Sequence, residues 1–161
     1  MGALTDTAHR HTPRVALLAG LAVLALAACA SGDDTAAQPI SVSDAWALAT
    51  VTGQPNGAVY FTIMSTGNDT LERVTVPDSI ADHTEMHEST TTATGAIGMQ
   101  ELKSGVALEP GTAVTFTPGG KHVMLVDLVQ PLAAGQTFDI TLEFASADPI
   151  TLPVAVVERA P

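Results

Sequence analysis

Between residues 40 and 157 the chain alternates short apolar runs with turn-forming residues, and few stretches keep a helical period over about 11 residues. Clear turns lie at Glu109-Pro110-Gly111, Pro118-Gly119-Gly120 and Asp148-Pro149. Regularly spaced glycine and proline of this kind are typical of short strands joined by tight connections. The expected strands are 40–48, 58–65, 71–76, 83–88, 97–101, 106–108, 114–116, 122–129, 138–144 and 150–157. We therefore predict an all-β domain, an antiparallel Greek-key β-sandwich or barrel.

The N-terminal segment has the features of an export signal. Arg10 and Arg14 precede the apolar run Val15–Ala28, which is shorter than the roughly 20 residues of a membrane-spanning helix. The end of this run, Leu26-Ala27-Ala28-Cys29, resembles the lipobox of bacterial lipoproteins, in which cleavage leaves a lipidated cysteine at the new N-terminus. We therefore predict a signal peptide over 1–28 and an exported, extracytoplasmic protein held on the membrane by lipid at Cys29. Ordinary secretion, with cleavage at a nearby small residue, is the alternative.

The rest of the chain is expected to form one domain. Residues 29–39 are small and polar, which indicates a flexible tether, and residues 40–161 form the predicted domain, which we expect to be a monomer. Cys29 is the single cysteine, so this domain has no thiolate for a zinc finger, an iron–sulfur cluster or a blue-copper site. The formal net charge of −11 argues against nucleic acid as a partner.

The segment from Met86 to Met124 gathers thioether and imidazole groups. It contains Met86-His87, Met99 and His122-Val123-Met124, whereas Met64 lies in an apolar run and is expected to pack in the core. A thioether prefers a soft cation and a neutral imidazole binds most first-row metals. A mixed set of both favours Cu(I).

Strand alternation predicts how these side chains are arranged. Residues two apart in a strand share a face, so His122 and Met124 should project side by side. Met86 and His87 are neighbours and face opposite ways, and His87 is the better candidate for the same site. Met99 follows the next turn and would return towards His87 on the following strand.

Two other functions compete with a copper site. His83, Glu85 and His87 alternate, so they could make a harder site for Zn(II) or Cu(II). The other alternative is a non-catalytic β-sandwich lipoprotein that acts as an interaction module. In that case the methionines would only pack in the fold. The sequence has no nucleophile elbow and no phosphate-binding glycine loop, so we expect no enzymatic activity.

The combined pattern resembles the periplasmic copper chaperone family PCu(A)C over residues 40–157. The matching pieces are His87, Met99, His122-x-Met124 after the Pro-Gly-Gly turn, Pro131-Leu132-x-x-Gly135, Val42-x-Asp44-Ala45-Trp46 and Asn56-Gly57-Ala58-x-Tyr60. The resemblance implies a cupredoxin-like β-sandwich in which His87, Met99, His122 and Met124 bind Cu(I). It also implies delivery of copper to the binuclear copper centre of cytochrome c oxidase, with an oxidase subunit or another copper chaperone as the acceptor.

Overall fold

The computed structural model describes residues 39–91 and 95–161. The predicted signal peptide, Cys29 and all but the last residue of the predicted tether lie outside these residues. The described strands are β1 (Ile40–Leu48), β2 (Gly57–Ser65), β3 (Asp69–Thr75), β4 (Ala81–Thr91), β5 (Ile97–Glu101), β6 (Val106–Leu108), β7 (Ala113–Phe116), β8 (Lys121–Leu128), β9 (Thr137–Phe144) and β10 (Ile150–Val157). Their bounds differ from the predicted ones by at most three residues, and the all-β prediction is confirmed. In the described part of the chain, no helix has the length and apolar character needed to cross a membrane.

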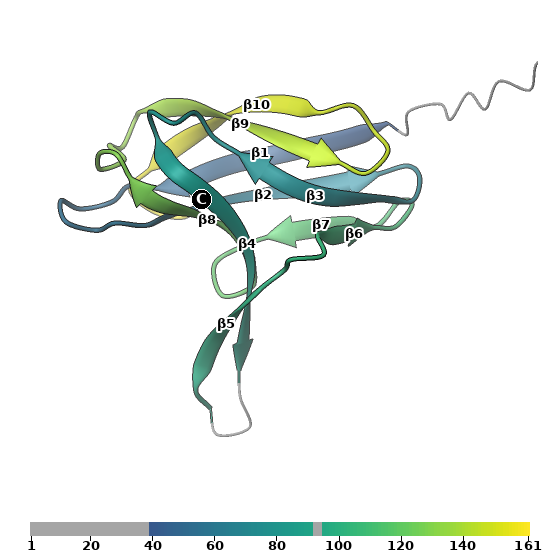
Figure 1. Cartoon of the computed structure of the whole chain (residues 1–161), viewed down its shortest axis with the longest axis horizontal. Helices are drawn as coiled ribbons and strands as arrows, with labels where there is room; N and C mark the ends of the chain where they lie inside the picture. Colours follow the sequence, from purple (N-terminus) through teal and green to yellow (C-terminus); the bar gives the residue numbers. More distant parts are fainter. Residues whose placement is uncertain (1–38, 92–94) are drawn as a thin grey trace, which may run out of the picture. The chain divides into compact units, whose positions relative to one another are not determined.

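The strands form one sheet in the order β5-β4-β8-β7-β2-β1-β10-β9-β3-β6 (Figure 1), and β8 also pairs with β2. The purely antiparallel arrangement that we predicted is wrong at two places, because β1 pairs with β10 in parallel and β7 pairs with β8 in parallel. Turn residues set the direction only of strands joined by a hairpin, and no hairpin joins β1 to β10. β7 and β8 both pair antiparallel with β2, β7 over Phe61–Met64 and β8 over Gly57–Val59, so they are parallel to each other.

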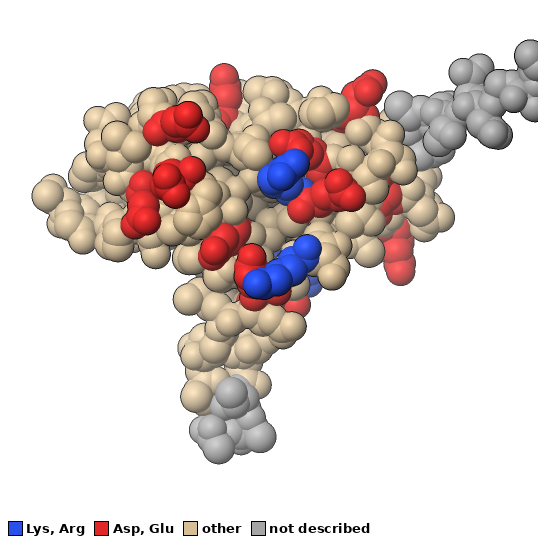
Figure 2. All heavy atoms as spheres, in the orientation of Figure 1, with Lys and Arg blue, Asp and Glu red and all other residues tan. Residues whose placement is uncertain are grey.

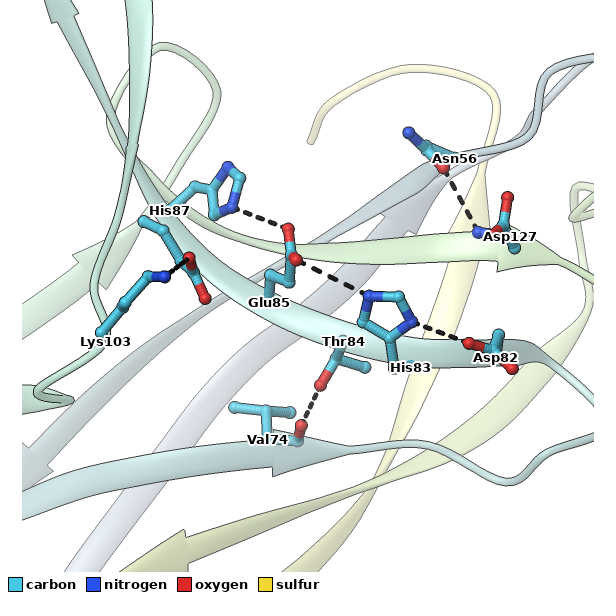
Figure 3. Close-up of polar contacts among 10 residues, drawn as sticks. Asn56, Val74, Asp82, His83, Thr84, Glu85, His87, Lys103 and Asp127 are labelled. Carbon is cyan, nitrogen blue, oxygen red and sulfur yellow. Dashed lines mark hydrogen bonds and ion pairs between the residues drawn. The ribbon is translucent and has the colours of Figure 1, made fainter.

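The sheet folds over and encloses an apolar core. β3 and β4 are far apart in the strand order, yet Thr84 of β4 donates a hydrogen bond to the carbonyl oxygen of Val74 in β3 (Figure 3). Phe61 and Phe116 stack inside with ring centroids 4.4 Å apart. The fully buried side chains come from strands along the whole sheet. They include Val59, Ile63, Leu71, Leu108, Val123, Leu125, Ile140, Leu142 and Val154. Burial of apolar area on this scale supplies most of the stability of such a domain.

Met64 does not pack in this core as predicted, because its side chain is 40% exposed while that of its neighbour Ile63 is fully buried. The run AVYFTIMS is apolar on both faces of the strand, so its pattern does not show which face meets the core. The structure directs Ile63 inward, and strand alternation then directs Met64 outward.

Charged side chains are distributed over the surface (Figure 2). Carboxylates are spread over the face in view. Three cationic side chains each lie against a carboxylate, in the pairs Arg73–Glu143 at 2.6 Å, Lys103–Glu101 at 3.1 Å and Lys121–Glu88 at 2.6 Å. The excess negative charge is therefore diffuse.

Candidate metal centre

β4 and β8 bring four polar or thioether side chains together on one face of the sheet. Their antiparallel register places His87 opposite His122 and Glu85 opposite Met124. Directly opposite residues share a face, and their Cβ atoms lie about 4.5–5.5 Å apart. We call these four residues the β4–β8 block. Met86 and Val123 lie on the other face and are buried in the core, so the face assignment predicted from strand alternation is confirmed here.

The two histidines of the block lie edge to face, with ring centroids 5.9 Å apart and planes inclined at 64°. Both side chains are shielded from solvent, since His122 is 8% exposed and the His87 side chain 12%. The two imidazole rings are therefore neighbours on one face of the sheet.

The turn before β8 orients His122. Gly119 has a φ of 81°, which a residue with a side chain rarely adopts, and the amide of Gly120 donates to the carbonyl of Thr117 at 3.0 Å. The carbonyl oxygen of Gly120 then lies 3.1 Å from Nδ1 of His122. A carbonyl can only accept, so Nδ1 carries the proton and Nε2 of the neutral ring keeps its lone pair for a metal.

His87 is held through its other nitrogen. Its Nε2 lies 3.0 Å from Oε2 of Glu85 (Figure 3), and because a carboxylate oxygen can only accept, this contact favours the tautomer with the proton on Nε2. The lone pair of the neutral ring is then on Nδ1, which is buried and has no hydrogen-bond partner within the described residues. Burying an acceptor without a partner costs about 1–3 kcal/mol, and a metal ion bound there would remove that cost.

An open cavity of about 340 Å³ lies next to the histidine pair, and Met99, His122 and Met124 line it. Met99 comes from β5, where it lies opposite Ser89 of β4, and its side chain is 62% exposed. The described residues that line the cavity include no charged side chain. Three of the four predicted ligands thus share one cavity, and His87 adjoins it through the ring of His122.

The alternative site of His83, Glu85 and His87 is not assembled. Glu85 lies between the two histidines, 3.6 Å from Nε2 of His83 and 3.0 Å from Nε2 of His87, and Nδ1 of His83 is 2.9 Å from Asp82. Across residues 39–91 and 95–161, no group of three or more His, Cys, Asp or Glu side chains is placed to hold a metal ion. These residues instead form a chain of polar contacts from the exposed Asp82 to His87 (Figure 3).

This chain of contacts predicts a measurable shift at His83. The hydrogen bond that His83 donates to Asp82 raises the pKa of His83 above its ordinary value of 6.5, and the charges of Asp82 and Glu85 add to the shift. Since the folded-state pKa is the higher one, the stabilisation is complete below the unfolded value and is lost as the pH rises through the folded one. We expect Asp82→Asn to lower the pKa of His83 in an NMR titration of its ring protons. Identical titration curves in wild type and variant would contradict this contact.

Glu85 is the member of the β4–β8 block that the sequence assigned only to the alternative Zn(II) or Cu(II) site and not to the Cu(I) site. Because Glu85 lies two residues before His87, strand alternation predicts that their side chains share a face. The register that places Glu85 opposite Met124 could not be predicted from the sequence, because β4 and β8 are distant in sequence.

Comparison with protein families and known proteins gives consistent matches. A family model described as "Putative lipoprotein LpqE-like" matches residues 40–156. A protein of Leifsonia xyli subsp. xyli, named as a "Putative lipoprotein", is 38% identical over 149 residues, which cover 90% of this chain and 88% of that protein.

Solved structures with a similar fold include copper-binding domains. The copper-bound PCuAC domain from PmoF2 superposes with a TM-score of 0.61 and 25% identity, covering 77% of this chain and 97% of that domain. The solution structure of Cu(I)-bound DR1885 from Deinococcus radiodurans has a TM-score of 0.59 and 26% identity, covering 81% of this chain and 86% of that one. The resemblance to PCuAC-type proteins inferred from the sequence, and the cupredoxin-like fold it implied, are confirmed.

Proposed function

Because this chain belongs to the LpqE-like lipoprotein family, we propose that it is an extracytoplasmic Cu(I) chaperone that a lipid at Cys29 anchors to the membrane. In this proposal residues 1–28 are the signal peptide, residues 29–39 the tether and residues 40–161 the copper-binding domain. The protein acts as a carrier and not as an enzyme, with copper as its cargo.

One observation carries the proposal. The buried Nδ1 of His87 has no hydrogen-bond partner among residues 39–91 and 95–161, and its ring lies 5.9 Å from that of His122, beside a cavity lined by Met99 and Met124. Two neutral imidazoles and two thioethers form a soft, uncharged donor set, which suits a monovalent copper ion. The copper-bound structures named above, which share this fold, support the same assignment.

The exposure of the site fits transfer of the ion to a partner. Met99 is 62% exposed on the edge strand β5, and the cavity beside it is open. An incoming ligand can therefore reach the copper ion and replace one thioether at a time without unfolding the domain. We propose a cytochrome c oxidase subunit, receiving copper for its binuclear centre, or another copper chaperone as the acceptor.

A competition titration tests this function. The purified protein is titrated with Cu(I) against a chromogenic chelator, beside the variants His87→Ala and Met124→Leu and the control Met64→Leu. We expect one tightly held Cu(I) per chain in the wild type and in the control, and a marked loss of affinity in the other two variants. Met124→Leu is nearly isosteric, so the fold should persist. A wild type that retains no Cu(I) would exclude the chaperone function and favour the interaction module.

A further inference from the structure

We propose that Glu85 is a positioning residue for the copper site, which sets the tautomer of His87 and supplies the negative charge that balances the bound ion. This inference rests on the proposed function and deepens it. It concerns a carboxylate that binds no copper itself and acts through a ligand.

The position of Glu85 in the sheet is the first argument. Glu85 is the fourth residue of the β4–β8 block. It shares a face of β4 with His87 and lies opposite Met124 of β8. Its side chain is 30% exposed, so it is partly removed from the solvent that would screen its charge. It is therefore next to two of the four proposed ligands.

The close contact between Glu85 and His87 is the second argument. Oε2 of Glu85 lies 3.0 Å from Nε2 of His87, and because a carboxylate oxygen can only accept, we infer that it holds the proton on Nε2 and leaves the lone pair on the buried Nδ1. A carboxylate in this position also makes the imidazole a stronger donor, as acceptors on the far nitrogen of metal-binding histidines generally do. We therefore infer that His87 binds copper through Nδ1, whereas His122 binds through Nε2 because its Nδ1 is paired with the carbonyl of Gly120.

The charge balance is the third argument. Cu(I) with two imidazoles and two thioethers carries one positive charge, and the described cavity lining has no charged side chain to offset it. The carboxylates nearest in the strand register are Glu101, opposite His87, and Glu88, and both pair with lysines, at 3.1 Å and 2.6 Å. Glu85 instead contacts the two histidines His83 and His87 (Figure 3). Of these three carboxylates, Glu85 is therefore the one that contacts a proposed copper ligand and has no lysine paired with it in the contacts described.

The test compares three variants with the wild type. Glu85→Leu removes both the acceptor and the charge, and Glu85→Gln keeps an acceptor oxygen without the charge. Glu101→Gln is the matched control, because it removes one negative charge opposite His87 from a carboxylate that pairs with Lys103. Cu(I) affinity is measured by chelator competition, and the tautomer of His87 in the metal-free protein is read from long-range ¹H–¹⁵N NMR spectra.

We expect the metal-free wild type to show His87 protonated on Nε2. Copper affinity should fall about 10–100-fold in Glu85→Leu, which is the usual cost of losing an outer partner of a metal-binding histidine. It should fall less in Glu85→Gln and change little in Glu101→Gln.

Three results would overturn the inference: His87 protonated on Nδ1 in the wild type, unchanged affinity in Glu85→Leu, or an equal loss in Glu101→Gln and Glu85→Gln. The NMR measurement needs no copper, so it tests the contact between Glu85 and His87 even if the wild type fails to retain Cu(I). Failure of this inference and failure of the proposed function are thereby separated.

Discussion

Replacing His122 with alanine is expected to abolish the retention of Cu(I). Loss of an outer partner of a metal-binding histidine lowers affinity by up to about 100-fold, and loss of His122, a proposed ligand, should lower it further. His122 lines the cavity, and its Nδ1 is paired with the carbonyl of Gly120, which leaves Nε2 available for copper. Alanine removes this donor and also the ring that lies beside His87. The two thioethers and one imidazole that remain would compete poorly with a chelator.

The matched control for this prediction is His83→Ala. His83 lies on the same strand as His87, but its Nδ1 is 2.9 Å from Asp82, and its side chain is 49% exposed. We expect this variant to retain Cu(I) as the wild type does. Thermal unfolding of both variants, followed by circular dichroism, checks that the fold persists. Retention of Cu(I) by a folded His122→Ala protein would remove His122 from the site.

Replacing Phe61 with alanine is expected to lower the free energy of unfolding by about 3–5 kcal/mol, the usual range for truncating a buried phenylalanine. Phe61 is 1% exposed and stacks on Phe116 with ring centroids 4.4 Å apart. It lies on β2, which pairs with β1, β7 and β8, so the cavity left by the change would lie beside a strand that three others share. Against a typical total of about 5–15 kcal/mol, this loss brings the domain close to unfolding.

Chemical denaturation measures this change, with Met64→Ala as the control. Met64 lies on the same strand, but its side chain is 40% exposed, and surface substitutions usually change stability by only about 0.5 kcal/mol. Equal slopes of the unfolding free energy against denaturant in all three proteins would show that the midpoints report stability. A loss below about 1 kcal/mol in Phe61→Ala would mean that the core can repack around the missing ring.

The strands were predictable because their signals are local. Turn residues such as Pro118-Gly119-Gly120 and the two-residue alternation of apolar side chains act over a few positions, so the strand bounds agree within three residues. The same alternation placed His122 and Met124 on one face of β8 and Val123 in the core. Wherever one face of a strand is clearly apolar, its neighbours along the chain are enough to assign the faces.

Prediction failed where both faces of a strand are apolar, where the partner strand is distant in the sequence, and at β7 and β8, whose parallel pairing follows from their shared partner β2. Met64 is exposed although its run is apolar throughout, and the parallel direction of β1 and β10 depends on a pairing that no turn determines. The role now proposed for Glu85 escaped the sequence for the same reason, since its position opposite Met124 follows from the register of β4 on β8.

The sequence alone determined the strand positions, the soft set of imidazole and thioether groups, and the family resemblance that implied a copper site. Each of these depends on residue type and on spacing along the chain. The tertiary structure decided the strand partners, the packing of His87 against His122 and the nitrogen of each ring that keeps its lone pair. Those features depend on distances between residues remote in sequence, which are established only when the apolar faces of the sheet pack together and bring β4, β5 and β8 side by side.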